Sequence, residues 1–505
     1  MEQCDGEIPV LSDVGDGCSE DRLSALTDDL LINILLKILD TAFAARTSVL
    51  SRRWRRLWTL MPKLLFHTSN PHHIHLALTA HKAPVLLHLG VSVIDPTPES
   101  LAAWIPIAAR RLSGDLYLIN MAEGNGDEAK ERCVFELPCF ERATSIVLQL
   151  GPLGPGVSMP LSGVFAQLTT LCLICVHLHG PCRLGEVVSS PRCPSLKRLI
   201  IHNAMGLRNF TIHSKSLKYI ELKNLWPDDP LGLGNFTIHS ESLLRMKLAS
   251  LHSLQQLTVM APVFTSLDVS SCFADGSSSI SAPQLKALHW RDVYHPSYTQ
   301  LKMENLQLLS CNPFFVYGQE AHKMRNSSCV GLLRRFKLIE NLILAPIYLT
   351  EITNHEYLME DIPRLANIAY MLLHIDPNRH SFGRSLFHLF SMCTGLRKLT
   401  LKLHHRTFGP VAQIACPSDC ACNEQSNWKT EELTPYRLKE VEVGDLGGTG
   451  HEAALRKRLF NWATVLETMT VTFDRSVAAN KAEEFCRMLQ SFSRPQICMR
   501  GPHFA

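Results

Sequence analysis

The chain has almost no excess of either charge. Its 505 residues include 50 lysines and arginines and 47 aspartates and glutamates, so its formal net charge is +3. A nucleic-acid binder or a protein of an anionic membrane surface needs a concentrated positive field, so we expect neither partner here. Charged residues make up only 19% of the chain, below the roughly 25% that is usual. We therefore expect that much of the chain is buried or that a partner covers part of its surface.

The sequence also lacks long apolar runs. None approaches the roughly 18 residues of a membrane-spanning helix, and the longest, from Leu30 to Leu39, is broken by Asn33 and Lys37. The first ten residues have neither the basic nor the apolar segment of a secretory signal. We expect an intracellular protein of the nucleus or cytoplasm that is not secreted. Its 17 cysteines are then expected to stay reduced, most of them as small buried hydrophobic residues.

Recognisable catalytic motifs are missing as well. There is no phosphate-binding Walker loop, no G-x-S-x-G, no H-E-x-x-H and no dinucleotide fingerprint. A cysteine nucleophile could have partners far away in the sequence, but no feature points to one. We therefore expect a protein that is not an enzyme and holds no cofactor.

One irregular segment, residues 404–435, invites a metal hypothesis. It contains His404, His405, Cys416, Cys420 and Cys422. The spacing Cys-x₃-Cys-x-Cys matches none of the usual paired zinc-binding arrangements. The alternative, polar loop cysteines without a metal, is favoured.

The N-terminal part predicts two regions. Residues 1–20 are acidic and glycine-containing, with no lysine or arginine, which predicts a disordered leader. Residues 21–66 predict short helices. Thr27 followed by Asp28 and Asp29 has the composition of a capped helix start. Apolar residues then recur at helical spacing: Leu30, Leu31, Ile34, Leu35 and Ile38.

A second helix is predicted from Thr47 to Leu60, ahead of Pro62. Its apolar residues fall on one stripe: Leu50, Trp54, Leu57 and Trp58. The basic run from Arg52 to Arg56 could contact nucleic acid beside an aromatic ring. No wider basic surface supports that alternative.

From about residue 100 to residue 403 the pattern Leu-x-x-Leu-x-Leu returns repeatedly. Its first clear units begin at Leu168, Leu196, Leu217, Leu243, Phe264 and Leu285, at intervals of 28, 21, 26, 21 and 21 residues. Weaker units begin at Met303, Ile339, Leu396 and Leu438. Intervals of about 20 to 29 residues are typical of leucine-rich repeats, whose short strands stack in parallel. The segment Asn209–Ser214 also recurs unchanged as Asn235–Ser240. Unrelated strands of an α/β protein would not give this regularity.

The rest of the chain is less regular. Residues 345–392 have a helical composition, with apolar clusters at 365–373 and 386–390. After the 404–435 insertion, residues 436–500 predict a strand from Leu438, a Gly447-Gly448 turn, a helix from Glu452 to Val465 and a final strand from Met469 to Phe473.

Residues 21–66 resemble the F-box of plant proteins. The matching stretches are Asp21-Arg22-Leu23-Ser24-x-Leu26, Asp28-Asp29-Leu30-Leu31-x-x-Ile34-Leu35 and Arg46-Thr47-Ser48-Val49-Leu50-Ser51-Arg52-Arg53-Trp54-Arg55-x-Leu57-Trp58. Residues 431–475 resemble the FBD-type C-terminal domain of plant F-box/leucine-rich-repeat proteins, through Leu438-Lys439-x-Val441, Gly448, Glu452, Leu459, Leu466-Glu467 and Met469. The chain departs from the family at Thr27, where proline is usual, and at Leu39-Asp40, where Leu-Pro is usual.

The resemblance implies an α/β fold: an N-terminal three-helix F-box, then an irregular leucine-rich-repeat solenoid with parallel strands, completed by the FBD-like region. It implies a substrate-recognition subunit of an SCF-type ubiquitin ligase, in which the F-box binds a Skp-type adaptor and through it a cullin. The implied adaptor-binding residues are Leu26, Thr27, Leu30, Ile34, Leu50, Arg53 and Trp54. The alternative is a repeat scaffold that binds a protein partner without a ubiquitin-ligase role.

The repeats also predict where a target protein would bind. In such a solenoid the strand side chains between the buried leucines line the concave face. After Cys172, these are Ile200, Glu221, Lys247, Asp268, His289 and Gln307. Because their charges alternate, they suit a folded protein better than a nucleic acid, which favours a continuous basic row.

Overall fold

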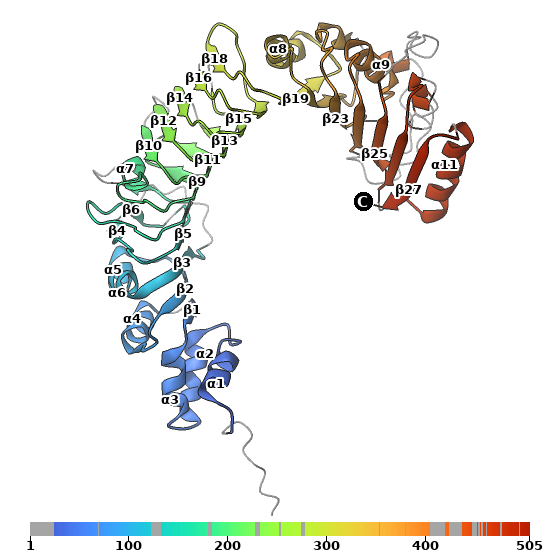
Figure 1. Cartoon of the computed structure of the whole chain (residues 1–505). Coiled ribbons are helices and arrows are strands. Elements are labelled where there is room, and N and C mark those ends of the chain that lie inside the picture. Colours follow the sequence, from blue (N-terminus) through green and yellow to red (C-terminus); the bar gives the residue numbers. More distant parts are fainter. Residues whose placement is uncertain are drawn as a thin grey trace, which may run out of the picture.

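The computed structural model describes residues 25–504, with gaps at 69, 123–132, 153, 180–183, 228–232, 252–253, 274–277, 353, 379, 405–419, 424–436, 447–451, 453–454, 456–457, 461, 475–476 and 494. The expected leader, residues 1–20, and the Gly447-Gly448 turn lie outside the described residues. Within them, no helix is long and apolar enough to cross a membrane. The molecule is an open arc with the helical module at one end and β27 at the other (Figure 1).

One parallel sheet of 17 strands runs the whole length of the arc. Its strands lie along the inner side of the curve in Figure 1, while the helices and the strands of the small sheets lie outside. In spatial order they are β1 (Lys63–His67), β2 (Leu86–Val93), β3 (Leu112–Asn120), β5 (Ser145–Gln149), β7 (Thr170–Ile174), β9 (Arg198–Met205), β11 (Tyr219–Trp226), β13 (Arg245–Leu251), β15 (Ser266–Ser270), β17 (Ala287–Arg291), β19 (Leu308–Phe315), β21 (Asn341–Ile347), β23 (Tyr370–Ile375), β24 (Lys398–Leu403), β25 (Glu440–Leu446), β26 (Thr468–Phe473) and β27 (Cys498–Phe504).

The leucine pattern explains this sheet. In β11, Ile220 and Leu222 are fully buried, while Glu221 between them faces the other side. Ile220 lies in register with Leu199 of β9 and Met246 of β13, so each repeat covers the apolar side chains of its neighbours. The predicted α/β class with a parallel-stranded solenoid is confirmed. The sheet already begins at β1, however, well before residue 100.

The outer side carries short strands and helices. Its small sheets are β4 (Val134–Glu136), β6 (Gly156–Ser158) and β8 (Leu178–His179); β10 (Phe210–Ser214), β12 (Asn235–Ser240) and β14 (Gln256–Met260); β16 (Ser278–Ser281) and β18 (Thr299–Lys302); and β20 (Tyr317–Gly318) with β22 (Glu356–Tyr357). Its helices are α4 (Pro71–Ala80), α5 (Pro98–Ala102), α6 (Ile105–Arg111), α7 (Leu184–Val187), α8 (Glu320–Arg335), η3 (Met359–Asp361), α9 (Gly383–Met392), η5 (Ala421–Asn423) and α11 (Ala479–Phe492).

The repeated hexapeptide becomes a ladder in this outer layer. Strands β10 and β12 pair in parallel with identical residues opposite one another. The rings of Phe210 and Phe236 lie 5.5 Å apart, and those of His213 and His239 stack at 4.8 Å. The repeated hexapeptide therefore forms equivalent strands in adjacent repeats.

Left-handed residues lie within two residues of the C-terminal ends of successive strands of the main sheet. Cys175, Asn203, Asn224, Ser250 and Ser271 all have φ between 51° and 55°. The Asn224 side chain donates from Nδ2 to Oδ1 of Asn203 at 2.8 Å. These corners follow the repeat interval and turn the chain from the inner sheet towards the outer layer.

The C-terminal region extends further than the sequence predicts. The expected strand near Leu438 is β25, and the strand expected from Met469 is β26. That strand is not the last, because α11 follows it and β27 then pairs with β26. The cluster 365–373 is not helical either: it leads into β23, whose Met371 and Leu373 face the core.

Candidate functional site

The N-terminal helical module has two apolar faces. It consists of α1 (Asp28–Leu35), α2 (Thr41–Arg46), η1 (Thr47–Val49), α3 (Trp54–Leu57) and η2 (Trp58–Leu60). Leu31 and Leu35 of α1 are fully buried, whereas Leu30 and Ile34 are 49% and 43% exposed. Because α1 is short and amphipathic, its second apolar pair is left facing solvent. Leu50 is also exposed, at 63%.

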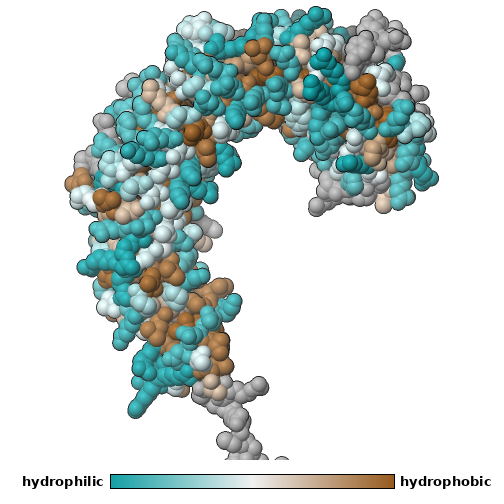
Figure 2. All heavy atoms as spheres, in the orientation of Figure 1, coloured by the Kyte–Doolittle hydropathy of each residue, from teal (hydrophilic) through white to brown (hydrophobic). Residues whose placement is uncertain are grey.

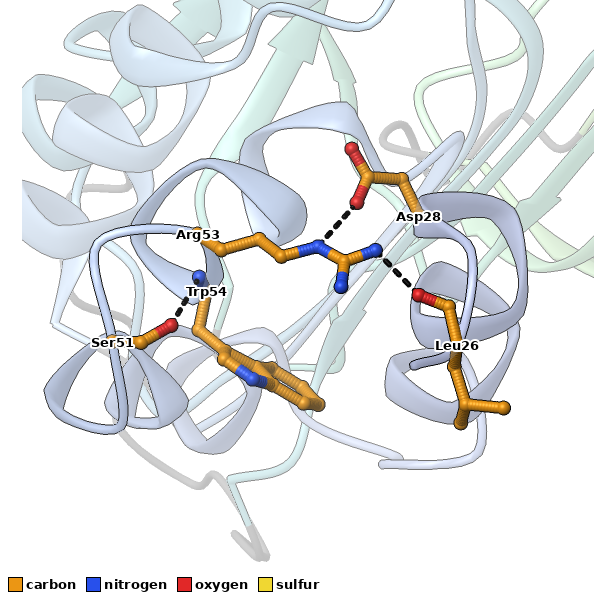
Figure 3. Close-up of polar contacts among 5 residues, drawn as sticks. All are labelled: Leu26, Asp28, Ser51, Arg53 and Trp54. Atoms are coloured by element: carbon orange, nitrogen blue, oxygen red, sulfur yellow. Dashed lines mark hydrogen bonds and ion pairs between the residues drawn. The ribbon is translucent and has the colours of Figure 1, made fainter. Parts of the chain in front are cut away.

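Arg53, just before α3, binds the residues at the start of α1. Its Nε donates to Oδ1 of Asp28 at 2.7 Å, and its terminal Nη2 donates to the Leu26 carbonyl at 2.5 Å (Figure 3). Of the predicted adaptor-binding residues, Arg53 is thus already engaged within the chain. An exposed ion pair contributes little energy by itself, but this arginine fixes the entrance of α1 relative to α3.

The predicted helix from Thr47 to Leu60 is wrong in one respect. It divides into η1, α3 and η2, with a turn between Leu50 and Trp54. The Ser51 hydroxyl accepts a hydrogen bond from the Trp54 N–H at 3.5 Å, an alternative to the helical bond. The expected single stripe is therefore split, since Leu57 is buried and Leu50 is exposed. Trp54 is half-buried and packs against the core.

The two departures from the family pattern behave differently. Thr27 is the N-cap residue of α1, as expected, but its hydroxyl makes no capping hydrogen bond. Asp40 has a role that the sequence did not reveal. Its Oδ1 accepts from the Ala42 N–H at 2.6 Å and its Oδ2 from the His67 N–H at 3.1 Å. This carboxylate therefore caps α2 and attaches the module to β1.

Five of the six predicted target-binding residues form one continuous row across the inner sheet. Ile200, Glu221, Lys247, Asp268 and His289 lie opposite one another on consecutive strands. Cys172 precedes them in register.

Gln307 does not belong to this row. The partner of His289 is Ser310, and Gln307 lies just before β19. The sequence placed this repeat three residues too early because Leu306 and Leu308 imitate its apolar spacing.

Among the charged residues of this row, the Glu221 carboxylate has a hydrogen bond and an ion-pair contact to neighbouring side chains. The Tyr219 hydroxyl donates to its Oε2 at 2.5 Å, and His202 Nε2 lies 3.3 Å from Oε1. Burial alone would raise the pKa of Glu221, but the Tyr219 hydrogen bond and the charges of His202 and Lys247 outweigh it and lower that pKa. Burial and the same hydrogen bond raise the pKa of Tyr219 to about 12. A fixed carboxylate therefore faces the concave side.

A second charged pair lies further along. Nη2 of Arg291 is 3.4 Å from Asp268, in the neighbouring strand. Burial lowers the pKa of His289, although Asp268 partly opposes this shift. Sequence reasoning missed Tyr219, His202 and Arg291. The sequence could have revealed them, because side chains two positions apart in a strand point to the same face. Each of the three lies two positions from a residue of the concave row.

The cysteines of the 404–435 insertion are arranged differently from expectation. His405 and Cys416 lie outside the described residues, and His404 contacts His374 at 3.0 Å between Nε2 and Nδ1. Cys420 and Cys422 are buried rather than exposed in a polar loop. Their sulfur atoms and a ring nitrogen of His380 all lie within 4.8 Å of one another. Among the described residues, these three could hold a metal ion.

Comparison with known proteins gives relatives of one kind. No protein-family model matches the chain. It is 31% identical over 229 residues to an F-box/FBD/LRR-repeat protein of Arabidopsis thaliana, covering 42% of this chain and 49% of that protein. An FBD-associated F-box protein of Arabidopsis thaliana is 30% identical over 213 residues, or 40% of this chain and 49% of the relative. The match thus spans about half the length of these two relatives.

A third relative is covered more fully. An F-box/LRR-repeat protein of Arabidopsis thaliana is 30% identical over 222 residues, which are 41% of this chain and 69% of that protein. The parallel repeat sheet agrees with these names. The chain therefore belongs to the plant F-box/LRR-repeat proteins, in the group that includes FBD-associated members.

Proposed function

We propose that this chain is the substrate-recognition subunit of an SCF-type ubiquitin ligase. Its helical module binds a Skp-type adaptor, and through it a cullin, while the repeats recruit a target protein. The chain itself supplies no catalytic group and works intracellularly, in the nucleus or cytoplasm. Catalysis then comes from proximity, because the bound target is held near a ligase assembled on the cullin.

The exposed apolar surface of the helical module carries this proposal. Six large hydrophobic residues there are between 43% and 87% exposed: Leu30, Ile34, Leu39, Phe43, Val49 and Leu50. Hydrophobic atoms are visible on the surface of this module in Figure 2. A soluble domain rarely leaves so many apolar side chains together in water unless a partner covers them. Their burial would provide the free energy of adaptor binding.

The adaptor-binding residues then have distinct roles. Leu30, Ile34 and Leu50 supply contact area, and the half-buried Trp54 reaches the same partner from the module core. Arg53 acts chiefly by holding the loop at Leu26 and Thr27 against α3.

The concave row supplies the target-binding half of the proposal. Alternating charges at Glu221, Lys247 and Asp268 lie on adjacent strands. Such a pattern favours a protein partner with complementary charges and disfavours wrong partners. The proposed division is an F-box (21–66), repeats (100–403), an insertion (404–435) and a C-terminal region (436–500), with the repeat sheet starting before residue 100, at β1.

Adaptor binding provides the direct test. The full chain with Leu50→Asp should bind a purified Skp-type adaptor roughly tenfold more weakly or worse by calorimetry, because a charge then enters an apolar contact. The matched control is Leu338→Asp, since Leu338 is 80% exposed but lies on the repeats, after α8. It should bind like the unmodified chain.

Two outcomes would contradict the proposal. If both variants bind the adaptor with equal affinity, Leu50 does not contribute to the interface. A chain that ignores the adaptor yet still captures a protein partner would instead be the repeat scaffold without a ligase role.

A further inference from the structure

Three metal-binding side chains meet beside the repeats. His380 lies in the loop between β23 and α9, and Cys420 and Cys422 come from the short segment that includes η5. All three are buried, and their ligand atoms lie within 4.8 Å of one another. The two segments are about 40 residues apart in sequence, so only the tertiary fold brings these groups together.

The His380 ring is already oriented as a ligand. Its Nε2 is 2.9 Å from the Leu349 carbonyl oxygen, which can only accept a hydrogen bond. Nε2 therefore carries the proton, and the neutral ring presents the lone pair of Nδ1. That Nδ1 lies 3.3 Å from Sγ of Cys420. Metal-binding histidines usually donate their other N–H to a carbonyl or carboxylate in this way.

The second sulfur is buried and accepts a hydrogen bond. Sγ of Cys422 accepts a hydrogen bond from the Ser381 N–H at 3.4 Å. The Tyr348 ring stacks on His380, with ring centroids 6.2 Å apart and planes at 23°. Tyr348 is itself fully buried, so water is largely excluded from this side of the cluster. Two thiolates in such surroundings would be costly to bury without a cation to balance them.

We propose that His380, Cys420 and Cys422 bind one zinc ion. Two thiolates and an imidazole form a soft ligand set that suits zinc, whereas calcium and magnesium require oxygen ligands. The two thiolates balance the ion's two charges once both thiol protons are released to solvent. Among the described residues, these three ligands fill three of the four tetrahedral positions of the ion.

Such an ion would have a structural consequence. It would link the loop before α9 to the insertion segment at 420–423, closing a long chain segment against the side of the solenoid. Closing a long loop by a metal restricts the unfolded chain and stabilises the folded one. Zinc would therefore hold this part of the insertion in place.

The experiment uses the full chain. After expression with added zinc and removal of loosely bound metal, elemental analysis should find about one zinc per chain. Cys420→Ser with Cys422→Ser, and separately His380→Ala, should lose that zinc. The control is Cys393→Ala, because Cys393 is equally buried at the end of α9 but is not among these ligands. It should retain the metal.

Cobalt provides a second readout that does not depend on measuring zinc content. Co²⁺ titrated into the metal-free chain should give a near-ultraviolet thiolate charge-transfer band, reduced to roughly half in Cys422→Ser alone. Adding a chelator should raise hydrogen exchange in 376–382 and 420–423, in the unmodified chain and in Cys393→Ala only.

Several results would overturn the proposal. They are zinc below about a tenth of an equivalent after reconstitution, copper in its place, a Cys420–Cys422 disulfide found by mass spectrometry, or zinc retained by both ligand variants. If the ligand variants do not fold, the unmodified chain still decides, because a Co²⁺ spectrum without a thiolate band would contradict the site.

Discussion

Asp40 and Thr27 show how single residues adjust the helical module. Asp40 stands where the family usually has proline, and its carboxylate satisfies N–H groups of both α2 and β1. An uncapped helix start of this kind would cost about 0.5–2 kcal/mol. Thr27 stands where the family also usually has proline, but its hydroxyl makes no equivalent capping bond. Asp40 therefore stabilises the module through its side chain, whereas the Thr27 hydroxyl makes no capping bond to α1.

Thr27→Pro should strengthen adaptor binding. The φ of Thr27 is −69°, close to the value that a proline ring imposes, so the backbone accepts the change without strain. The proline ring adds apolar surface at the entrance of α1, and it should raise the stability of the fold by about 0.4–1 kcal/mol through the unfolded state. Calorimetry with the adaptor and thermal unfolding measure the two effects.

The control for this residue is Thr27→Ala. Because the hydroxyl makes no capping bond, this variant should keep its stability within about 0.5 kcal/mol. If Thr27→Pro binds no better than Thr27→Ala, the missing proline is neutral for docking.

At the level of the elements, the strand corners determine how the repeats stack. Asn203 and Asn224 occupy left-handed backbone positions at equivalent corners, and the Asn224 side chain binds that of Asn203. Asparagine tolerates this conformation better than other side chains. One residue type therefore supplies both the turn and the contact between neighbouring repeats.

Asn224→Val should destabilise the repeats by about 2–3 kcal/mol. A β-branched residue with positive φ costs more than asparagine, and the hydrogen bond to Asn203 is lost as well. Asn224→Gly removes only the bond, so it should cost about 1 kcal/mol. Urea unfolding of the full chain provides the measurement.

The matched control at this corner is Lys223→Val, on the exposed neighbouring position of β11. Valine suits a strand there, so stability should change little. Equal losses for Asn224→Gly and Asn224→Val would show that the hydrogen bond alone matters and that backbone strain does not.

For the whole molecule, the arc presents one long inner surface, and the proposed target recruitment depends on it. Glu221, Lys247 and Asp268 lie side by side, so reversing all three preserves their alternation. The variant Glu221→Lys, Lys247→Glu, Asp268→Lys should keep its fold and its adaptor binding. It should lose the protein partner that co-purifies with the unmodified chain, as quantified by mass spectrometry.

The corresponding control reverses charges on the outer layer. Lys215→Glu with Glu241→Lys changes two exposed residues that follow β10 and β12. This variant should retain the partner. If the triple variant also retains it, recognition lies outside the concave row, in the 404–435 insertion or the C-terminal region.

The repeat architecture and the resemblance to the family were both readable from local spacing. Burial along a strand has a period of two, so the spacing of leucines such as Leu199 and Ile220 specifies which side faces the core. The start of α1 after Thr27 was equally readable, because the two acidic residues of the first turn and the helical periodicity are local properties, although the Thr27 hydroxyl makes no capping bond. The row from Ile200 to His289 followed directly from the same spacing.

Three other features could not be read from the apolar spacing. Ser51 interrupts the second helix because its hydroxyl competes with a backbone hydrogen bond. Ser310 rather than Gln307 continues the concave row because pairing with β17 sets the register of β19. His380 meets Cys420 across 40 residues. The register of β19 and the meeting of His380 with Cys420 depend on contacts between distant segments, which only the folded chain brings within bonding distance. The break at Ser51 is local, but the helical spacing of the apolar residues around it conceals it in the sequence.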